Sequence, residues 1–355
     1  MALNFNPAGK RTILSIDGGG MRGIIPVKML AYLEQETGKP AYELFDMVAG
    51  TSTGAIIAAG LGLGMTAQQI LEIAYRDRLP KSFGSNSGCA FWFRYIVRNR
   101  LRYHYSLEPF RKSLSEFTDG KRIRDLDKCI VLMTVKDLRT GNTYYVTNAG
   151  PGASAFGDWP VAGAVAASGA APVYFPPVLG NLIDGGVGVY ANPSLVASVE
   201  AVEYIGFDPA NTLHVSLGTG YSANVLKEGQ GRRYDLFDWV QYIIAEGLDD
   251  AALQQVYNTR AIYSDKGMDF RRYNPDLALS NVTKVLGVDA RGVCTDDLAL
   301  DSTGATEIAV MEDIGLAYAQ GIDWSLPDQM PWDTVGGHSQ PRIEPVNWRG
   351  STYEV

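Results

Sequence analysis

Short apolar runs alternate with segments of helical periodicity along most of the chain. The runs are rich in β-branched residues, which is typical of strands buried on both faces of a sheet. We interpret 12–16, 44–49, 130–135, 142–147 and 213–217 as strands, and 24–35, 66–75, 161–168 and 236–257 as helices. Strands that alternate with helices predict an α/β fold with a mostly parallel central sheet that helices cover on both faces.

The pattern changes near Asp323. From there the chain is rich in Pro, Gly and Trp and shows no periodicity. We therefore expect one domain over residues 1–322 and an irregular tail, 323–355, packed on it. Residues 1–11 lack the apolar core of a secretory signal, and Gly, Thr, Ser or Pro interrupts each long apolar stretch. The expectation is a cytoplasmic protein without a membrane span.

Composition and charge narrow the classes of function. The chain has 355 residues, of which 46% are hydrophobic and 20% charged, as in ordinary globular proteins. Its formal net charge of −8 argues against a general nucleic-acid binder. It contains three cysteines without a Cys-x-x-Cys pair, and three histidines. These few ligands predict no transition-metal site.

A serine lies in a glycine-flanked turn between an expected strand and an expected helix. The turn, 50–54, has the sequence Gly-Thr-Ser-Thr-Gly. In this context Gly-x-Ser-x-Gly is typical of a nucleophile on a sharp turn, where a Cβ at Gly50 or Gly54 would crowd the backbone. The dipole of the following helix favours developing negative charge. We predict that Ser52 is the nucleophile of an acyl hydrolase; the alternative is a plain glycine-rich turn.

A second glycine loop, 18–23, follows the first strand. Gly18, Gly20 and Gly23 fit the dinucleotide pattern Gly-x-Gly-x-x-Gly, so a nucleotide-binding module is one interpretation. The other is an oxyanion hole, because both loops leave the carboxyl ends of parallel strands and face one crevice. Successive glycines present backbone amides without side chains in the way.

Within this loop we choose Gly19 and Gly20 as the oxyanion donors. Arg22 would add a fixed positive charge for binding an anion, and a surface salt bridge is its alternative role. Asp17, which precedes the loop, is expected to hold the loop's backbone.

Two residues compete as the general base that a serine nucleophile needs. His338 satisfies the order Ser-Asp-His of an α/β-hydrolase triad, but it lies in the irregular tail. Asp184 ends an apolar run, and the small residues Gly185 and Gly186 follow it. Partial desolvation would raise the pKa of Asp184 and make it a stronger base. We favour Asp184, for which an Asx turn is the alternative role.

The other two histidines are weaker candidates. His214 lies inside an expected strand, where it would be buried and structural. His104 lies in a segment rich in arginine and tyrosine that we interpret as a surface helix.

Five motifs in order resemble those of the patatin-like phospholipases. They occupy 16–23, 50–54, 170–176, 184–186 and 216–220. The resemblance implies a three-layer α/β/α sandwich and a Ser–Asp dyad without histidine. By motif, Ser52 would be the nucleophile, Asp184 the base, and Gly19 and Gly20 the oxyanion donors. It also implies hydrolysis of acyl esters of phospholipids or related lipids, without a metal or cofactor.

One departure from the family pattern follows the acid. The family often has Asp-Gly-Gly-Val-x-Ala-Asn-Asn-Pro, whereas 184–193 is one residue longer and keeps a single asparagine of that pair. The course of this loop and the role of Asn192 are therefore open.

The segment 79–107 has no acidic residue and interleaves basic with aromatic side chains. One interpretation is a surface over 91–105 that contacts anionic lipid headgroups at a membrane. The other, which we favour, is a cap helix whose aromatic residues pack inward. Some bacterial members of the family are membrane-degrading effectors switched on by a small signalling molecule, which is a further alternative for this chain.

Overall fold

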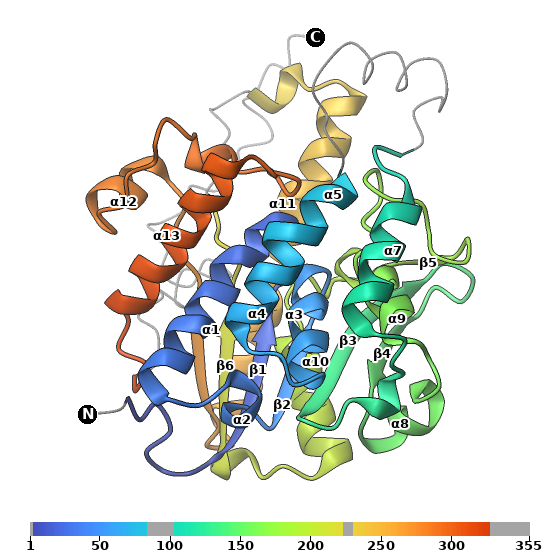
Figure 1. Ribbon diagram of the computed structural model, residues 1–355, viewed down its shortest axis with the longest axis vertical. Helices are drawn as coiled ribbons and strands as arrows, with labels where there is room; N and C mark the ends of the chain where they lie inside the picture. The colour runs from blue at the N-terminus through green and yellow to red at the C-terminus, as the bar shows by residue number, and fades with distance from the viewer. Residues whose placement is uncertain (1–2, 84–102, 223–229, 327–355) are drawn as a thin grey trace, which may run out of the picture.

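The computed structural model describes residues 3–83, 103–222 and 230–326, which are coloured in Figure 1. His338, most of the segment 91–105 and nearly all of the expected tail lie outside the described residues. The domain boundary near residue 323 stays a prediction. The first residues of the expected tail contact the domain, since the Trp324 indole donates to the Ala319 carbonyl and the Tyr273 hydroxyl to the Leu326 carbonyl.

A seven-stranded, mostly parallel sheet forms the centre of the molecule. Its strands are β1 Arg11–Ile16, β2 Met47–Gly50, β3 Ile130–Asp137, β4 Thr143–Thr147, β5 Leu182–Asp184, β6 Thr212–Leu217 and β7 Asp269–Tyr273. The order is β4-β3-β2-β1-β6-β7, and β5 also pairs with β3. Only β4 and β5 run antiparallel to their neighbour. The expected α/β architecture is confirmed.

The strands are buried because both of their faces are apolar. In β1, Leu14 and Ile16 enter the larger core, while Ile13 points to the smaller core on the opposite face. In β2, Val48 enters the larger core and Met47 enters the smaller one. This alternation follows from the two-residue period of a strand, and it makes helices on both faces of the sheet necessary.

Helices form the two outer layers. Their bounds are α1 Ile24–Thr37, α2 Ala41–Leu44, α3 Thr53–Gly62, α4 Ala67–Ile70, α5 Leu79–Phe83, α7 Leu107–Thr118, α8 Gly150–Phe156, α9 Val161–Ser168, α10 Ser194–Val199, α11 Leu236–Tyr263, α12 Leu279–Lys284 and α13 Ala305–Gly321. In Figure 1, α1, α4 and α13 lie on the side of the sheet toward the viewer. Side chains of α10 enter the smaller core on the opposite face. The three layers give the expected α/β/α sandwich.

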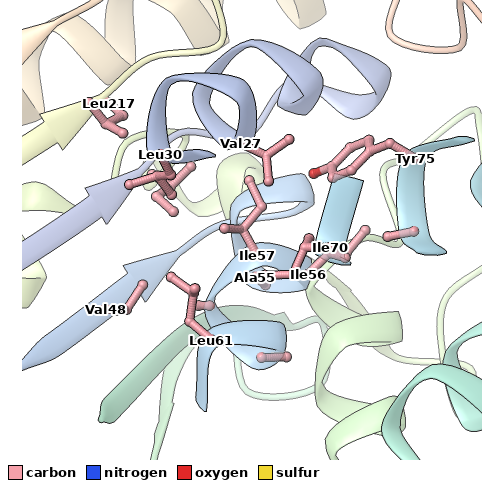
Figure 2. Close-up of a cluster of buried hydrophobic side chains, with 14 of the residues drawn as sticks. Val27, Leu30, Val48, Ala55, Ile56, Ile57, Leu61, Ile70, Tyr75 and Leu217 are labelled. Atoms are coloured by element: carbon pink, nitrogen blue, oxygen red, sulfur yellow. The ribbon is translucent and has the colours of Figure 1, made fainter. Parts of the chain in front are cut away.

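Helix α3 is buried along its whole length. Figure 2 shows Ile57 and Ala55 of α3 among Val27 of α1, Val48 of β2 and Ile70 of α4. A helix that is apolar all round requires this position between a sheet and other helices. Its amino end is therefore fixed relative to the end of β2.

Three sequence interpretations need correction at their boundaries. The strand expected over 44–49 begins only at Met47, because Pro40 starts the short helix α2 and the Asp46 carboxylate accepts from the backbone of Thr12 (2.8 Å). The helix expected over 66–75 has its Thr66 cap, in a capping box with Gln69, but continues as a π-helix over Leu71–Arg78 and then as α5. The helix expected over 236–257 extends to Tyr263.

Candidate active site

The Ser52 turn joins the end of β2 to the start of α3. Ser52 has φ 56° and ψ −117°, a conformation that glycine adopts readily and other residues rarely do. A Cβ at Gly50 would lie 2.1 Å from the carbonyl carbon of Gly54, and one at Gly54 would lie 2.3 Å from the Ile16 oxygen. The flanking glycines thus permit a turn that raises the serine above the sheet.

Hydrogen bonds from neighbouring segments hold this turn. The Ser52 amide donates to Ser168 Oγ at the end of α9 (2.9 Å). Thr51 Oγ1 lies 2.7 Å from Thr134 Oγ1 and donates to the Tyr190 carbonyl (2.6 Å). These bonds fix the strained serine from two sides, which is the condition under which strain persists. The sequence pattern gave no sign of Ser168 or Thr134.

Strand β3 brings Asp184 next to this turn. β2 pairs with β3 up to Gly50, which lies opposite Met133. Two residues later along β3, Val135 lies opposite Asp184 of β5. Because β4 occupies the other edge of β3 there, β5 takes the edge that β2 leaves free. Two residues of a strand span about 7 Å. The serine turn and the carboxylate therefore meet at one edge.

The carboxylate of Asp184 is buried and accepts a hydrogen bond from the Gly186 amide (2.7 Å). The Ser52 side chain lies near enough to this carboxylate to influence its pKa. Burial raises the pKa of Asp184 to about 6, although the interactions with Gly186 and Ser52 act in the opposite direction. At neutral pH the group is still ionised, and its proton affinity is higher than that of an ordinary aspartate. The Asx turn to Gly186 exists together with the contact to Ser52.

Gly185 and Gly23 allow close packing around these two residues. A Cβ at Gly185 would lie 2.1 Å from Thr134 Oγ1. A Cβ at Gly23 would lie 2.2 Å from Thr53 Oγ1 and 2.3 Å from the Tyr75 hydroxyl. The third glycine of the Gly-x-Gly-x-x-Gly pattern therefore has a packing role that needs no nucleotide.

The loop of successive glycines lies against the nucleophile. A Cβ at Gly18 would lie 3.3 Å from Ser52 Cβ, and the Gly18 amide donates to the Ala191 carbonyl (2.8 Å). The amides of Gly19 and Gly20 have no acceptor among the described residues. Gly20 has φ 56°, and a Cβ on it would lie 2.1 Å from the Leu300 oxygen. The two amides that the sequence analysis chose as oxyanion donors are thus left without a bonded partner in this part of the structure, and their role stays a prediction.

A buried ion pair anchors this loop. Arg272 of β7 donates two hydrogen bonds to the Asp17 carboxylate (2.8 and 2.5 Å), and Asn192 Nδ2 donates a third (2.6 Å). Arg272 and Asn192 also donate to Ser216 Oγ (3.0 Å each). The Asp17 carboxylate thus accepts from Arg272 and Asn192, and no bond from it to the loop's own backbone is found among the described residues, which differs from the expectation. Asn192 is part of the support at the base of the loop. The sequence pattern gave no sign of Arg272.

Arg22 lies under the same loop. Burial lowers the pKa of its guanidinium, and its Nε is buried without a hydrogen-bond partner among the described residues. The side chain as a whole is partly exposed, and the carboxylates of Asp249 and Asp17 oppose the lowering of its pKa. Anion binding and an ion pair therefore both stay open as roles of Arg22.

Two histidines are described, and neither is placed as a base. Both ring nitrogens of His214 are bonded within the sheet, to Ser198 Oγ and Ser15 Oγ (2.9 Å each), and burial lowers its pKa to about 3. This is the buried structural histidine that the sequence predicts. His104 lies before α7 rather than in a helix, and its ring packs against Tyr105 and Tyr174.

Within the described residues, no group of three His, Cys, Asp or Glu side chains is arranged to hold a metal ion. The helices of that same part of the chain include none with the length and apolar character needed to cross a bilayer.

Comparisons with known proteins relate this site to a family. The family model described as patatin-like phospholipase matches residues 14–197, slightly more than half of the chain. The cGAMP-activated phospholipase of Vibrio cholerae is 29% identical over 211 residues, which cover 55% of this chain and 59% of that protein. Patatin group J-1 of Solanum tuberosum is 27% identical over 245 residues, covering 59% and 60%.

Two other similar proteins match less well, one in coverage and one in sequence identity. Phospholipase A I of Arabidopsis thaliana is 28% identical over 162 residues, 38% of this chain and 12% of that protein. The crystal structure of VipD from Legionella pneumophila aligns at 13% identity with a TM-score of 0.38, covering 88% of this chain and 66% of that one. The chain spans 60% or less of the length of these three curated relatives. On the family match over residues 14–197, the chain belongs to the patatin-like phospholipase family.

Proposed function

We propose that this protein is a lipid acyl hydrolase that releases fatty acids from phospholipids or related acyl esters through a Ser52–Asp184 dyad. One observation carries the proposal: the strained Ser52 turn lies beside a buried carboxylate, that of Asp184, whose pKa burial raises to about 6. A base of that pKa is ionised at neutral pH and accepts a proton more readily than an ordinary aspartate. Membership of the family supports the substrate class.

The reaction follows from the geometry of the two loops. Asp184 accepts the hydroxyl proton as Ser52 Oγ attacks the ester carbonyl carbon. The free amides of Gly19 and Gly20 donate to the oxyanion of the tetrahedral intermediate. When the intermediate collapses, the ester bond breaks and the leaving alcohol takes the proton from Asp184. Water, deprotonated by the same carboxylate, then attacks the acyl-serine. The bond between the acyl carbon and Ser52 Oγ breaks, Oγ takes the proton back from Asp184, and the fatty acid is released.

Two fixed positive features support the negative charge that develops. The amino end of α3 begins directly after Ser52, so its helix dipole points at the reacting group. Arg22, within the glycine loop, supplies a guanidinium whose Nε is buried and unbonded among the described residues. A charge in a site shielded from water acts more strongly than one in solution.

The first test is hydrolysis of a panel of phospholipids by the parent protein and two variants. Ser52→Ala and Asp184→Asn should each lower fatty-acid release by about a thousandfold or more, because each removes one half of the dyad. Ser264→Ala and Asp265→Asn, on an exposed turn after α11, are matched controls and should keep full activity. Full activity in either dyad variant would refute the assignment.

The nucleotide-binding alternative makes a different prediction. Labelling by a fluorophosphonate requires an activated serine, so a nucleotide-binding module would not react. We expect labelling of the parent protein, and none of Ser52→Ala.

Activation by a signalling molecule is a second candidate, which the name of one relative favours. The Vibrio cholerae protein is described as cGAMP-activated. Fatty-acid release measured with and without cGAMP would decide whether this chain shares that control. An unchanged rate would exclude it for cGAMP.

A further inference from the structure

We propose that three turns beside Asp184 form a surface that docks on an anionic lipid bilayer. We call this surface the docking rim and define it by Leu138, Leu179, Val187 and Val189, with Lys136 and Arg139. The proposal rests on the proposed function, because it assigns the face through which that site would meet its substrate. In Figure 1 the turns that follow β3 and precede β5 lie at the right-hand side, beside β5.

The rim exposes apolar side chains in conformations that are costly for them. Leu179 is 87% exposed and has φ 52°, and Val189 is exposed with φ 72°. Glycine and asparagine are the usual residues at such positive φ values, and a β-branched residue is an outlier there. Neither side chain gains enough burial within the protein to offset that cost. An external apolar partner would supply the missing burial.

Hydrogen bonds hold two of the turns together. The Leu138 amide donates to the Asn181 carbonyl (2.9 Å). The buried Asp137 carboxylate accepts from Asn181 Nδ2 (2.8 Å), from the Arg139 amide (2.9 Å) and from the Tyr144 hydroxyl (2.7 Å). Leu138 and Leu179 are therefore displayed from a preformed support, so docking would cost little ordering of the backbone.

The third turn connects the rim to the catalytic residues. It follows Asp184, and a Cβ at Gly188 would lie 2.4 Å from Thr143 Oγ1 and 3.4 Å from the Lys136 side chain. This turn thus packs against the β3–β4 hairpin. One residue after Val189, the Tyr190 carbonyl accepts from Thr51, the neighbour of Ser52. A bilayer bound to the rim would therefore lie close to the turn that contains the nucleophile.

Charge identifies the kind of partner. The only carboxylates in 130–148 and 171–191 are Asp137 and Asp184, and both are buried. The charges that these segments display are those of Arg139, which is paired with Asp137 at 3.5 Å, and of Lys136, which is partly exposed. Asp137 offsets the charge of Arg139, so Lys136, whose Nζ donates to the Gly141 carbonyl, is the positive charge left over on the rim. Since neither carboxylate of these segments is exposed, the rim favours an anionic lipid surface over a neutral one.

Vesicle binding tests the proposal independently of hydrolysis. The Ser52→Ala protein is used as the parent, with vesicles of phosphatidylcholine alone or mixed equally with phosphatidylglycerol, and binding is measured by co-sedimentation. Adding Leu179→Asn should lower the partition coefficient by about tenfold, because one large apolar side chain is lost from the contact. Asparagine tolerates the same φ, so the melting temperature should not fall. Val285→Asn, at a site 74% exposed and outside the rim, is the matched control and should bind like the parent.

A second pair of variants tests the charge. Lys136→Gln and Arg139→Gln should each weaken binding to the anionic vesicles several-fold and leave binding to the neutral vesicles unchanged. Hydrolysis of a short soluble ester by an otherwise wild-type Leu179→Asn protein should equal that of the wild type. If that protein loses soluble-ester hydrolysis, the turn serves the dyad rather than docking.

Two further results would overturn the docking rim. One is equal partitioning of the parent and Leu179→Asn. The other is loss of self-association in Leu179→Asn, measured by light scattering, which would identify a second copy of the chain as the occupant. If the vesicle results hold while no lipid is hydrolysed, the proposed function fails and docking stands.

Discussion

Ser52 combines backbone strain with a buried base. Its φ of 56° is one that a side chain makes unfavourable, and its hydroxyl faces a carboxylate that burial makes more basic. Both features were foreseeable from the sequence, because glycines flank the serine at 50 and 54 and follow Asp184 at 185 and 186. The support from Ser168 and Thr134 was not, because hydroxyl pairing between distant segments leaves no local pattern.

Replacing Ser52 by glycine should release the strain of the turn. We expect Ser52→Gly to be more stable than Ser52→Ala by about 1 kcal/mol, because glycine adopts this φ freely and alanine does not. Urea unfolding of both inactive variants measures the difference. Equal stability would mean that the turn is relaxed.

The raised pKa of Asp184 predicts the acid side of the pH profile. Only the carboxylate can accept the serine proton, so kcat/KM should fall about tenfold per pH unit below pH 6, the approximate pKa of this group. A profile flat through pH 6 would argue against this base.

The same pKa predicts a change in stability with pH. Since the folded pKa exceeds the ordinary value of 3.8, the folded state binds this proton more tightly than the unfolded state. The protein should therefore lose stability relative to Asp184→Asn as the pH rises from about 4 to 6, and thermal melts of both across that range measure it.

At the scale of elements, β3 aligns the dyad and β7 supports the glycine loop. Strands β1, β3 and β6 were predictable because their apolar runs are long enough to show a pattern. β5 has three residues and α2 four, too few for any periodicity. β7 contains Arg271 and Arg272, which look unlike a buried strand until their partners, the partly buried Asp269 and the buried Asp17, are known.

Removing the arginine of the buried pair should damage both fold and catalysis. Arg272→Met leaves the Asp17 carboxylate buried with only Asn192, so we expect a loss of about 3 kcal/mol in the free energy of unfolding. We also expect a lower kcat as the loop relaxes. Adding Asp17→Asn should recover stability but not kcat. If Arg272→Met alone unfolds with the same free energy as the parent, the ion pair does not stabilise the fold.

At the scale of the whole molecule, the site depends on chain beyond the family match. Residues 14–197 run from within β1 to beyond β5, while β6 and β7 extend the sheet on the other side of β1. Arg272 reaches from β7 to the glycine loop, and α13 approaches α1 so closely that a Cβ at Gly315 would lie 2.7 Å from the Ile25 oxygen. The sequence motifs predicted the reacting groups. They did not mark these long-range supports, which depend on the assembled fold.

The central claim is that Ser52 works with Asp184 and without a histidine. The most direct measurement compares fatty-acid release from a phospholipid by Asp184→Asn and His338→Ala, each beside the parent protein. We predict that Asp184→Asn loses about a thousandfold or more in rate, while His338→Ala stays within a few-fold of the parent. A large loss in His338→Ala, with activity kept by Asp184→Asn, would contradict the dyad and restore the triad.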